Sequence, residues 1–232
     1  MSSDRRFEYE TGPELETERG AAERDERTGD DEQSEAGADD DGRPVAVVAP
    51  WKGGIVAGVS AFGVMFAAFY QLVSAFSATG GYSQGDTGPS DWVAASMTSL
   101  ANHGVTILQD GEPMEGFATL TLGLTPYVTG IVPAVVLAVA GYLLVRYVRL
   151  ESRRDAGLAL GSLVASYVVL TGSLSLIARW TPEQGSDAAR ETTTISAAAD
   201  FGAIVAIGGT ALVFAAIGAG VAALPQLLTA RR

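Results

Sequence analysis

Four long stretches of this sequence carry no charged side chain, and they limit what the chain can fold into more than any other feature. They cover residues 53–78, 117–145, 156–178 and 201–230 of the 232-residue chain. A helix of about twenty apolar residues spans the hydrocarbon core of a bilayer, and each stretch reaches that length. We therefore expect an all-α integral membrane protein, a bundle of four transmembrane helices at about 53–77, 123–147, 156–178 and 201–226.

The beginning of the chain differs in composition from the rest. Residues 1–50 hold sixteen of the 27 acidic residues and six of the fifteen basic ones. Up to residue 44 there are almost no apolar side chains, and such a segment cannot bury enough surface to offset the entropy lost on ordering. We expect a disordered acidic tail over residues 1–44 and a four-helix membrane domain over residues 45–232.

Basic residues near the ends of membrane spans orient a membrane protein, because they favour the cytoplasmic side. The loop between the second and third spans, RYVRLESRRD, carries four of them: Arg146, Arg149, Arg153 and Arg154. Residues 78–116 include no Lys or Arg and five acids. This pattern predicts a plasma-membrane protein with both termini in the cytoplasm and a long outer loop over residues 78–122. A fifth span over residues 92–108 would put the arginine loop outside, and we reject it.

Within the outer loop, the segment GPSDWVAASMTSLANHG predicts one short amphipathic helix with a modest apolar face. Ser90 can cap its start, and Asn102-His103-Gly104 suits its end, because Asn and Gly accept left-handed backbone geometry. We expect this helix to lie on the membrane surface or on the bundle. The residues after it predict a β-hairpin with an acidic turn and with strands at 105–108 and 117–122.

Asn102 and His103 are the only Asn and the only His of the chain. One hypothesis joins His103 with Asp110, Glu112 and Glu115 in a metal or acid–base cluster, because such sites use imidazole and carboxylate groups. A single His without a second nitrogen or sulfur ligand makes a weak zinc site, and the chain has no Cys. We therefore favour a helix end followed by a solvated turn, and we expect no cofactor.

Small residues recur at helical spacing along three of the predicted spans. Such stripes let helices approach closely, which is how helices associate inside a bilayer. The stripes consist of Gly54, Gly58 and Ala61 in the first span, Gly157, Gly161 and Gly172 in the third, and Gly202, Ala206, Gly209, Ala216 and Gly220 in the fourth. We expect them to pack helices together, either within the bundle or between copies of the chain.

Two rows of hydroxyl side chains occur on the second and third spans. They consist of Thr121, Thr125 and Thr129 and of Ser162, Ser166 and Ser173. One hypothesis is that they line a polar cavity for a neutral solute, since hydroxyls and carbonyls can line a pore. The alternative, which we favour, is that they bond to neighbouring helices or to carbonyls one turn earlier.

The composition also indicates a source and a set of partners. Lys occurs once beside fourteen Arg, and Ala, Val and Gly dominate the apolar residues. Together with the acidic tail, this composition resembles that of membrane proteins from halophilic archaea. The resemblance covers the whole chain, carries no family motif, and implies a lineage but no activity.

The net charge of −12 argues against a nucleic-acid partner. We expect the lipid bilayer as partner, with anionic headgroups as candidates at the arginine loop.

The four uncharged stretches, residues 53–78, 117–145, 156–178 and 201–230, contain no Asp, Glu, Lys, Arg or His. Proton relays, ion-coupled transporters and intramembrane hydrolases use ionisable groups at membrane depth, so these classes are disfavoured. We expect a non-enzymatic membrane protein of structural, assembly or accessory character, as a homo-oligomer or in a larger membrane complex. The alternative is a channel or transporter component for a small solute, lined by the Thr and Ser rows.

Overall fold

The computed structural model describes residues 48–79, 88–114, 126–181 and 194–229. These residues contain four helices that are long and apolar enough to cross a membrane: α1 (Pro50–Ala78), α4 (Pro126–Tyr147), α5 (Arg153–Ile177) and α6 (Phe201–Thr229). This is the architecture of a multi-pass membrane protein, and the helix bounds agree with the four predicted spans. The predicted acidic tail, residues 1–44, lies outside the described residues.

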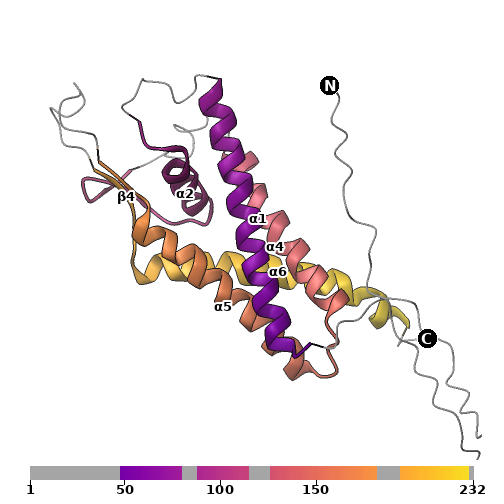
Figure 1. The fold of residues 1–232 in the computed structure, drawn as a ribbon. Coiled ribbons are helices and arrows are strands. Elements are labelled where there is room, and N and C mark those ends of the chain that lie inside the picture. The colour runs from indigo at the N-terminus through magenta and orange to yellow at the C-terminus, as the bar shows by residue number, and fades with distance from the viewer. Residues whose placement is uncertain (1–47, 80–87, 115–125, 182–193, 230–232) are drawn as a thin grey trace, which may run out of the picture. The chain divides into compact units, whose positions relative to one another are not determined.

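One short helix and four short strands complete the described structure. α2 (Asp91–Asn102) follows α1, and β1 (Ile107–Gln109) and β2 (Glu112–Pro113) follow α2. β3 (Arg179–Trp180) comes directly after α5, and β4 (Ile195–Ala197) leads into α6. The strands form one antiparallel sheet in the order β2-β1-β4-β3, so the fold is mostly rather than purely helical. Figure 1 shows α2 and the sheet at the end of the bundle where α5 ends and α6 begins.

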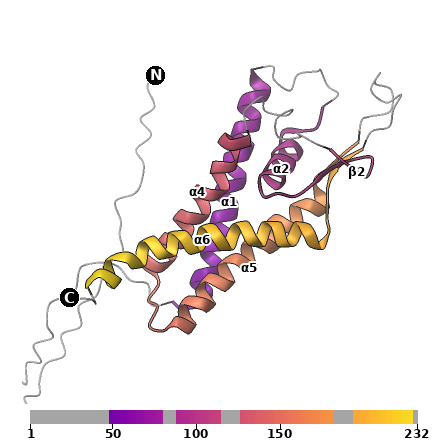
Figure 2. The same ribbon diagram turned by 180° about the vertical axis from the view of Figure 1, so that it is seen from behind.

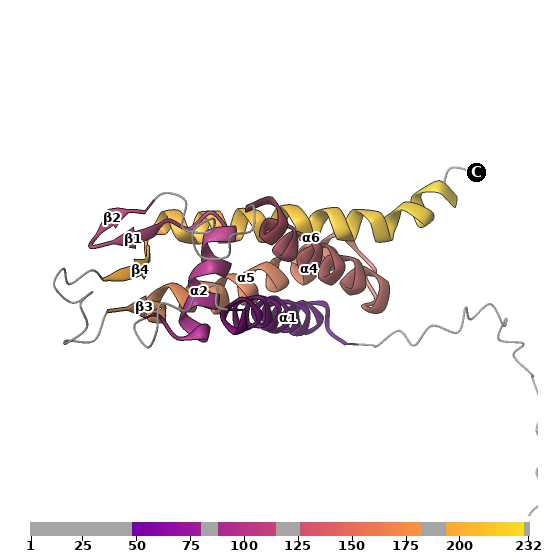
Figure 3. The same ribbon diagram turned by 90° about the horizontal axis from the view of Figure 1, so that it is seen from above.

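The four long helices form two close pairs. α1 packs chiefly against α5, and α4 packs chiefly against α6. From above, in Figure 3, α1 and α6 lie on opposite sides of the bundle with α4 and α5 between them. The rear view in Figure 2 shows α6 crossing over α5.

Glycines set the closest approach in the α1–α5 pair. A Cβ atom at Gly54 would collide with the carbonyl oxygen of Ala159, and one at Gly58 with the carbonyl oxygen of Leu163. The two backbones therefore touch. Ala61 continues the same stripe and is buried. Lipid tails are as apolar as the helices, so this close contact is what favours their pairing in a bilayer.

The α4–α6 pair uses glycines that the predicted stripes do not include. A Cβ atom at Gly218 would collide with the carbonyl oxygen of Ala138, and one at Gly141 with that of Ala215. Both glycines are buried. The second pair is therefore held in the same way as the first.

The predicted stripes of α5 and α6 do not make close contacts within the described part of the chain. A Cβ atom would meet nothing within 4 Å at Gly157, Gly161, Gly172, Gly209 or Gly220. Gly202 and Ala216 are exposed and Ala206 is half-buried, while the buried row of α6 runs through Ala203, Ile207, Ala211 and Ala215. Small residues fit on either face of a membrane helix, so spacing alone did not identify the packed one.

The hairpin after α2 is tighter than the sequence predicts. β1 agrees with the predicted strand at 105–108, but Asp110 and Gly111 alone form the turn, with φ of +52° and +87°. Positive φ at both positions is the geometry of a two-residue type I′ turn, for which Asp-Gly is a preferred sequence. β2 therefore begins at Glu112, and residues 117–122 lie outside the described residues.

The sheet also joins the loop between α1 and α4 to the loop between α5 and α6, which the sequence did not indicate. Leu108 of β1 lies opposite Ser196 of β4, and Trp180 of β3 lies opposite Ile195 of β4. Strands of two or three residues give little signal in a sequence, because their pairing depends on segments far away in the chain. The two loops therefore end in a single structural unit with α2.

Two glycines of α6 provide a matched test of this packing. We expect Gly218→Ala to lower the free energy of unfolding by about 1–3 kcal/mol, because the new methyl group overlaps the backbone of α4. Gly220→Ala, two residues away in open space, should cost nothing and should gain up to about 1 kcal/mol from helix propensity. Denaturant unfolding of the purified protein in detergent measures both. Equal effects of the two substitutions would contradict the α4–α6 contact.

Candidate functional site

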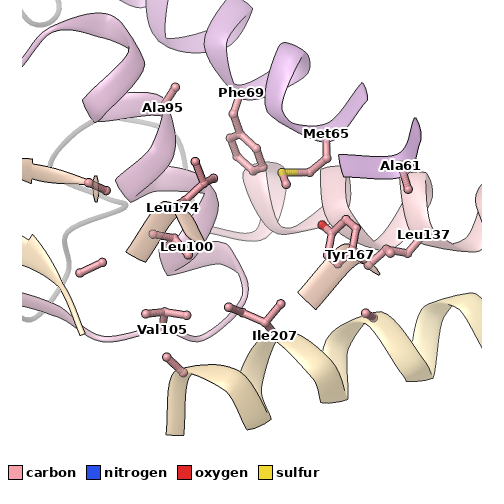
Figure 4. Close-up of a cluster of buried hydrophobic side chains, with 14 of the residues drawn as sticks. Ala61, Met65, Phe69, Ala95, Leu100, Val105, Leu137, Tyr167, Leu174 and Ile207 are labelled. Atoms are coloured by element: carbon pink, nitrogen blue, oxygen red, sulfur yellow. The ribbon is translucent and has the colours of Figure 1, made fainter. Parts of the chain in front are cut away.

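α2 lies within the helix bundle, which is the second of the two positions predicted for it, and not on the membrane surface. Residues 93–100 are all buried. Figure 4 shows Ala95 and Leu100 of α2 in the same apolar cluster as Phe69 of α1 and Leu174 of α5. The helix is built mainly from Ala, Ser, Thr and apolar residues and has no charged face, and a helix of that kind is suited to burial.

The start of α2 is tied to the end of α1. The carboxylate of Asp91 accepts a hydrogen bond of 2.7 Å from the hydroxyl of Ser74 and one of 2.9 Å from that of Ser77. Asp91 also lies in the first turn of α2, where a negative charge is favoured by the helix dipole. One half-buried carboxylate therefore joins two helices and stabilises the beginning of the second.

The end of α2 is tied to α4 through Asn102. The side-chain oxygen of Asn102 accepts a hydrogen bond of 2.9 Å from Thr129, which is buried in α4. Its amide nitrogen donates to the carbonyl of Thr98, one turn earlier in α2, at 2.8 Å. The amide thus uses its donor and its acceptor, and it connects a short helix with a long one.

α2 ends at the residues that the sequence predicts. His103 is the C-cap, and Gly104 follows with φ of +81°. The backbone N–H of Gly104 donates to the carbonyl of Ala101, and that of Val105 donates to the carbonyl of Leu100. This pair of bonds with glycine in the left-handed region is a Schellman motif, and its hydrophobic contact is supplied by buried Val105 and Leu100.

His103 is more than a helix cap, because its side chain points into the bundle. It is 2% exposed, and its Nε2 lies 2.8 Å from the hydroxyl oxygen of Tyr167 in α5. Its Nδ1 lies 2.8 Å from the carbonyl oxygen of Ser99. Tyr167 is fully buried and appears at the centre of Figure 4 between Met65 and Leu137. The only His of the chain therefore links α2 to α5.

The partners of His103 indicate its tautomer, and its burial favours the neutral form. A carbonyl oxygen only accepts, so Nδ1 carries the proton and donates to Ser99. In the neutral ring Nε2 is then the acceptor, and the hydroxyl of Tyr167 donates to it. Burial lowers the pKa of His103 from its usual value of 6.5, while the bond to the Ser99 carbonyl acts in the opposite direction. The imidazole is therefore neutral at neutral pH.

The structure does not bring His103 to the acidic turn. Asp110 is engaged in the sheet, where its carboxylate accepts a bond of 2.7 Å from the backbone N–H of Thr194. Glu112 is exposed in β2, and Glu115 lies outside the described residues. Among the described residues, no three His, Asp or Glu side chains gather in a group that could hold a metal ion. His103 is directed at Tyr167 instead.

The hydroxyl rows divide among different surroundings. Ser162 donates to the carbonyl of Ala159, Ser166 to that of Ser162 and Ser173 to that of Val169. Ser162 and Ser166 lie in a groove beside α1, whereas Ser173 lies in another beside α6. Thr129 is buried against Asn102, and Thr121 and Thr125 lie outside the described residues. The described members therefore do not share one cavity.

The arginine loop is exposed and short. Arg146 donates a bond of 2.9 Å to the hydroxyl of Tyr142, and Arg149 pairs with Glu151 at 3.4 Å. α5 begins immediately afterwards with a capping box, in which Ser152 and Asp155 bond reciprocally. Arg153 and Arg154 are exposed in the first turn of α5. All four guanidinium groups can therefore reach water or lipid headgroups.

Three contacts thus fasten α2: Asp91 to α1, Asn102 to α4 and His103 to α5. We call them the α2 clasp. Sequence reasoning identified Asn102 and His103 but missed Tyr167. A tyrosine hydroxyl inside an apolar span needs a hydrogen-bond partner, and this requirement could have indicated from the sequence that Tyr167 binds a polar side chain. The clasp uses its polar groups to position a helix inside the bundle.

Comparison with known proteins gives one match. The model of a family of unknown function (DUF7978) matches residues 29–226, which is most of the chain. No curated protein and no solved structure matches the chain significantly.

The His103–Tyr167 bond can be tested by a double-mutant cycle. Tyr167→Phe keeps the ring but leaves the buried Nε2 of His103 without a donor, so we expect a loss of about 1–3 kcal/mol in the free energy of unfolding. In a protein that already carries His103→Leu, Tyr167→Phe should lower the free energy of unfolding much less than it does in the wild type. The difference is the coupling energy, which we expect to be about 0.5–3 kcal/mol. Tyr142→Phe is the control, because the hydroxyl of Tyr142 pairs with exposed Arg146. Additive single effects would show that the bond contributes nothing.

The lowered pKa of His103 predicts a pH dependence of stability. In the unfolded chain the imidazole titrates near 6.5, whereas the buried imidazole stays neutral to lower pH. Below pH 6.5 the unfolded state therefore binds a proton that the native state does not, and stability falls as the pH falls, by at most about 1.4 kcal/mol per unit. Unfolding between pH 5 and 8 measures the slope, and His103→Gln should lack it. The same slope in both proteins would assign the effect to other groups.

Proposed function

Because the chain belongs to the DUF7978 family, which has no assigned function, we propose its role from its own geometry. We infer that it is a non-enzymatic multi-pass membrane protein of structural, assembly or accessory character. Its working surface is the outer cap, which we define as α2 together with the four-stranded sheet.

The observation that carries this proposal is the position of α2. Eight consecutive residues of this helix are buried, and the clasp holds it against three spanning helices. α2 therefore occupies the space that a solute would need in order to enter the bundle from the cap end. A fixed plug of this kind supports a structural role and counts against the alternative of a channel or transporter component.

We propose the plasma membrane as the setting, with both termini in the cytoplasm and the outer cap on the opposite side. The four exposed arginines near the α4–α5 turn support this orientation. The acidic, lysine-poor composition supports an origin in a halophilic archaeon, with a disordered tail over residues 1–44.

The proposal includes protein partners within the membrane and no nucleic acid. The small residues of the α6 stripe face outward, so a helix from another protein or from a second copy can approach them closely. This supports membership in a larger complex or a homo-oligomer. The bilayer itself and anionic headgroups at the arginine loop are the remaining partners.

The absence of Cys from the chain permits a direct test of the proposal. Glu112→Cys places a unique thiol on the exposed β2 strand of the outer cap. We expect a membrane-impermeant cross-linker, applied to intact cells, to join this thiol to a discrete neighbour in the membrane.

A second experiment measures permeability. Vesicles that contain the purified protein should be no more permeable to glycerol and urea than protein-free vesicles.

Arg149→Cys is the matched control, because it places the thiol in the arginine loop on the opposite side of the membrane. Its thiol should react with the cross-linker only after the cell membrane is permeabilised. Reaction of this variant in intact cells would overturn the proposed orientation. The channel alternative would be favoured if the wild-type protein made the vesicles permeable and if His103→Ala changed the rate of solute entry.

A further inference from the structure

A groove of about 440 Å³ lies between α1 and α4, away from the α2 clasp. Buried Ala61 and Ala140 line it together with Val64, Val139 and Leu143, which are exposed. Ser60 is the only side chain with a polar atom among its lining residues. A volume of this size falls within the range of small-molecule sites, and its lining suits hydrocarbon.

The groove points toward the end of the bundle that carries the arginine loop. A Cβ atom at Gly53 would lie 2.7 Å from Val148, so the start of α1 is level with the end of α4. Along α4, Val139, Leu143 and Arg146 follow positions i, i+4 and i+7, which share one helix face. The groove therefore runs along α4 to a point one turn from an exposed guanidinium.

Arg146 is positioned at this end of the groove. Its guanidinium lies 5.9 Å from the ring centroid of Tyr142, and Nη1 donates to the Tyr142 hydroxyl at 2.9 Å. Among the described residues, the one ion pair is between Arg149 and Glu151, so no described carboxylate neutralises Arg146. Arg146 thus presents a hydrogen-bonding cation that no described carboxylate neutralises, one helical turn beyond Leu143 of the groove.

We propose that the α1–α4 groove is a binding site for one anionic phospholipid, with an acyl chain along the groove and the phosphate at Arg146. Lipid acyl chains surround a groove in the membrane-spanning region, and their hydrocarbon matches the apolar lining of this groove. A guanidinium pairs with phosphate through several hydrogen bonds, and net charge selects the headgroup, because the choline cation of a zwitterionic lipid offsets its phosphate charge. The site rests on the headgroup contact proposed above for the arginine loop and narrows it to Arg146, but it does not depend on the accessory role.

Native mass spectrometry of the full-length protein tests the site. The protein in detergent is titrated with phosphatidylglycerol and phosphatidylcholine of identical acyl chains. We expect one phosphatidylglycerol to bind about fivefold more tightly than phosphatidylcholine, the preference that one interfacial arginine provides. Arg146→Gln should abolish the preference, and Ser60→Phe, which fills the groove from an exposed position, should weaken binding of both lipids.

Two matched controls separate this site from general effects. Arg149→Gln removes a loop arginine that pairs with Glu151, and Leu212→Phe places a ring at an exposed position of α6 outside the small-residue stripe. Both should bind the two lipids as the wild type does. The proposal is overturned if the wild type shows no preference, if Arg149→Gln loses it as fully as Arg146→Gln, or if Ser60→Phe dissociates a wild-type dimer, which would make a second copy the occupant.

Discussion

The hydrogen bond between His103 and Tyr167 is the contact on which the interior of this protein depends. It joins the end of a twelve-residue helix to the middle of a spanning helix at a place that excludes water. A buried imidazole or phenol without a partner costs free energy, and here each satisfies the other. Because the imidazole is neutral, no charge has to be buried with it. The bond can therefore lie among apolar side chains such as Leu137 and Met65.

The glycine contacts and the polar clasp have complementary roles. At Gly54 and Gly58 the backbones of α1 and α5 touch, which leaves no room between them near the arginine-loop end. Toward the opposite end, α2 lies between the helices, and Ser74 and Ser77 of α1 bind its Asp91. Close packing holds one end of the bundle, and a short helix with polar contacts holds the other.

The spans could be predicted because length and absence of charge are properties of each segment alone. The packed faces could not, because in a membrane apolar and small residues suit both lipid and protein neighbours. Gly54 and Gly58 of one predicted stripe lie where α1 and α5 touch, whereas Gly209 and Gly220 of another face open space. The end of α2 followed from local backbone chemistry, but its burial and its bond to Tyr167 depend on a segment 64 residues later.

α2 and the four-stranded sheet are connected to each other in sequence and in space. β1 follows the Schellman turn of α2, β3 comes directly after α5, and β4 leads into α6. Pairing of β1 with β4 therefore connects the end of α2 to the start of α6, while His103 connects it to α5. Any displacement of α2 would have to break strand pairs as well as the clasp. This double attachment ties α2 to the sheet as well as to the three long helices that it contacts.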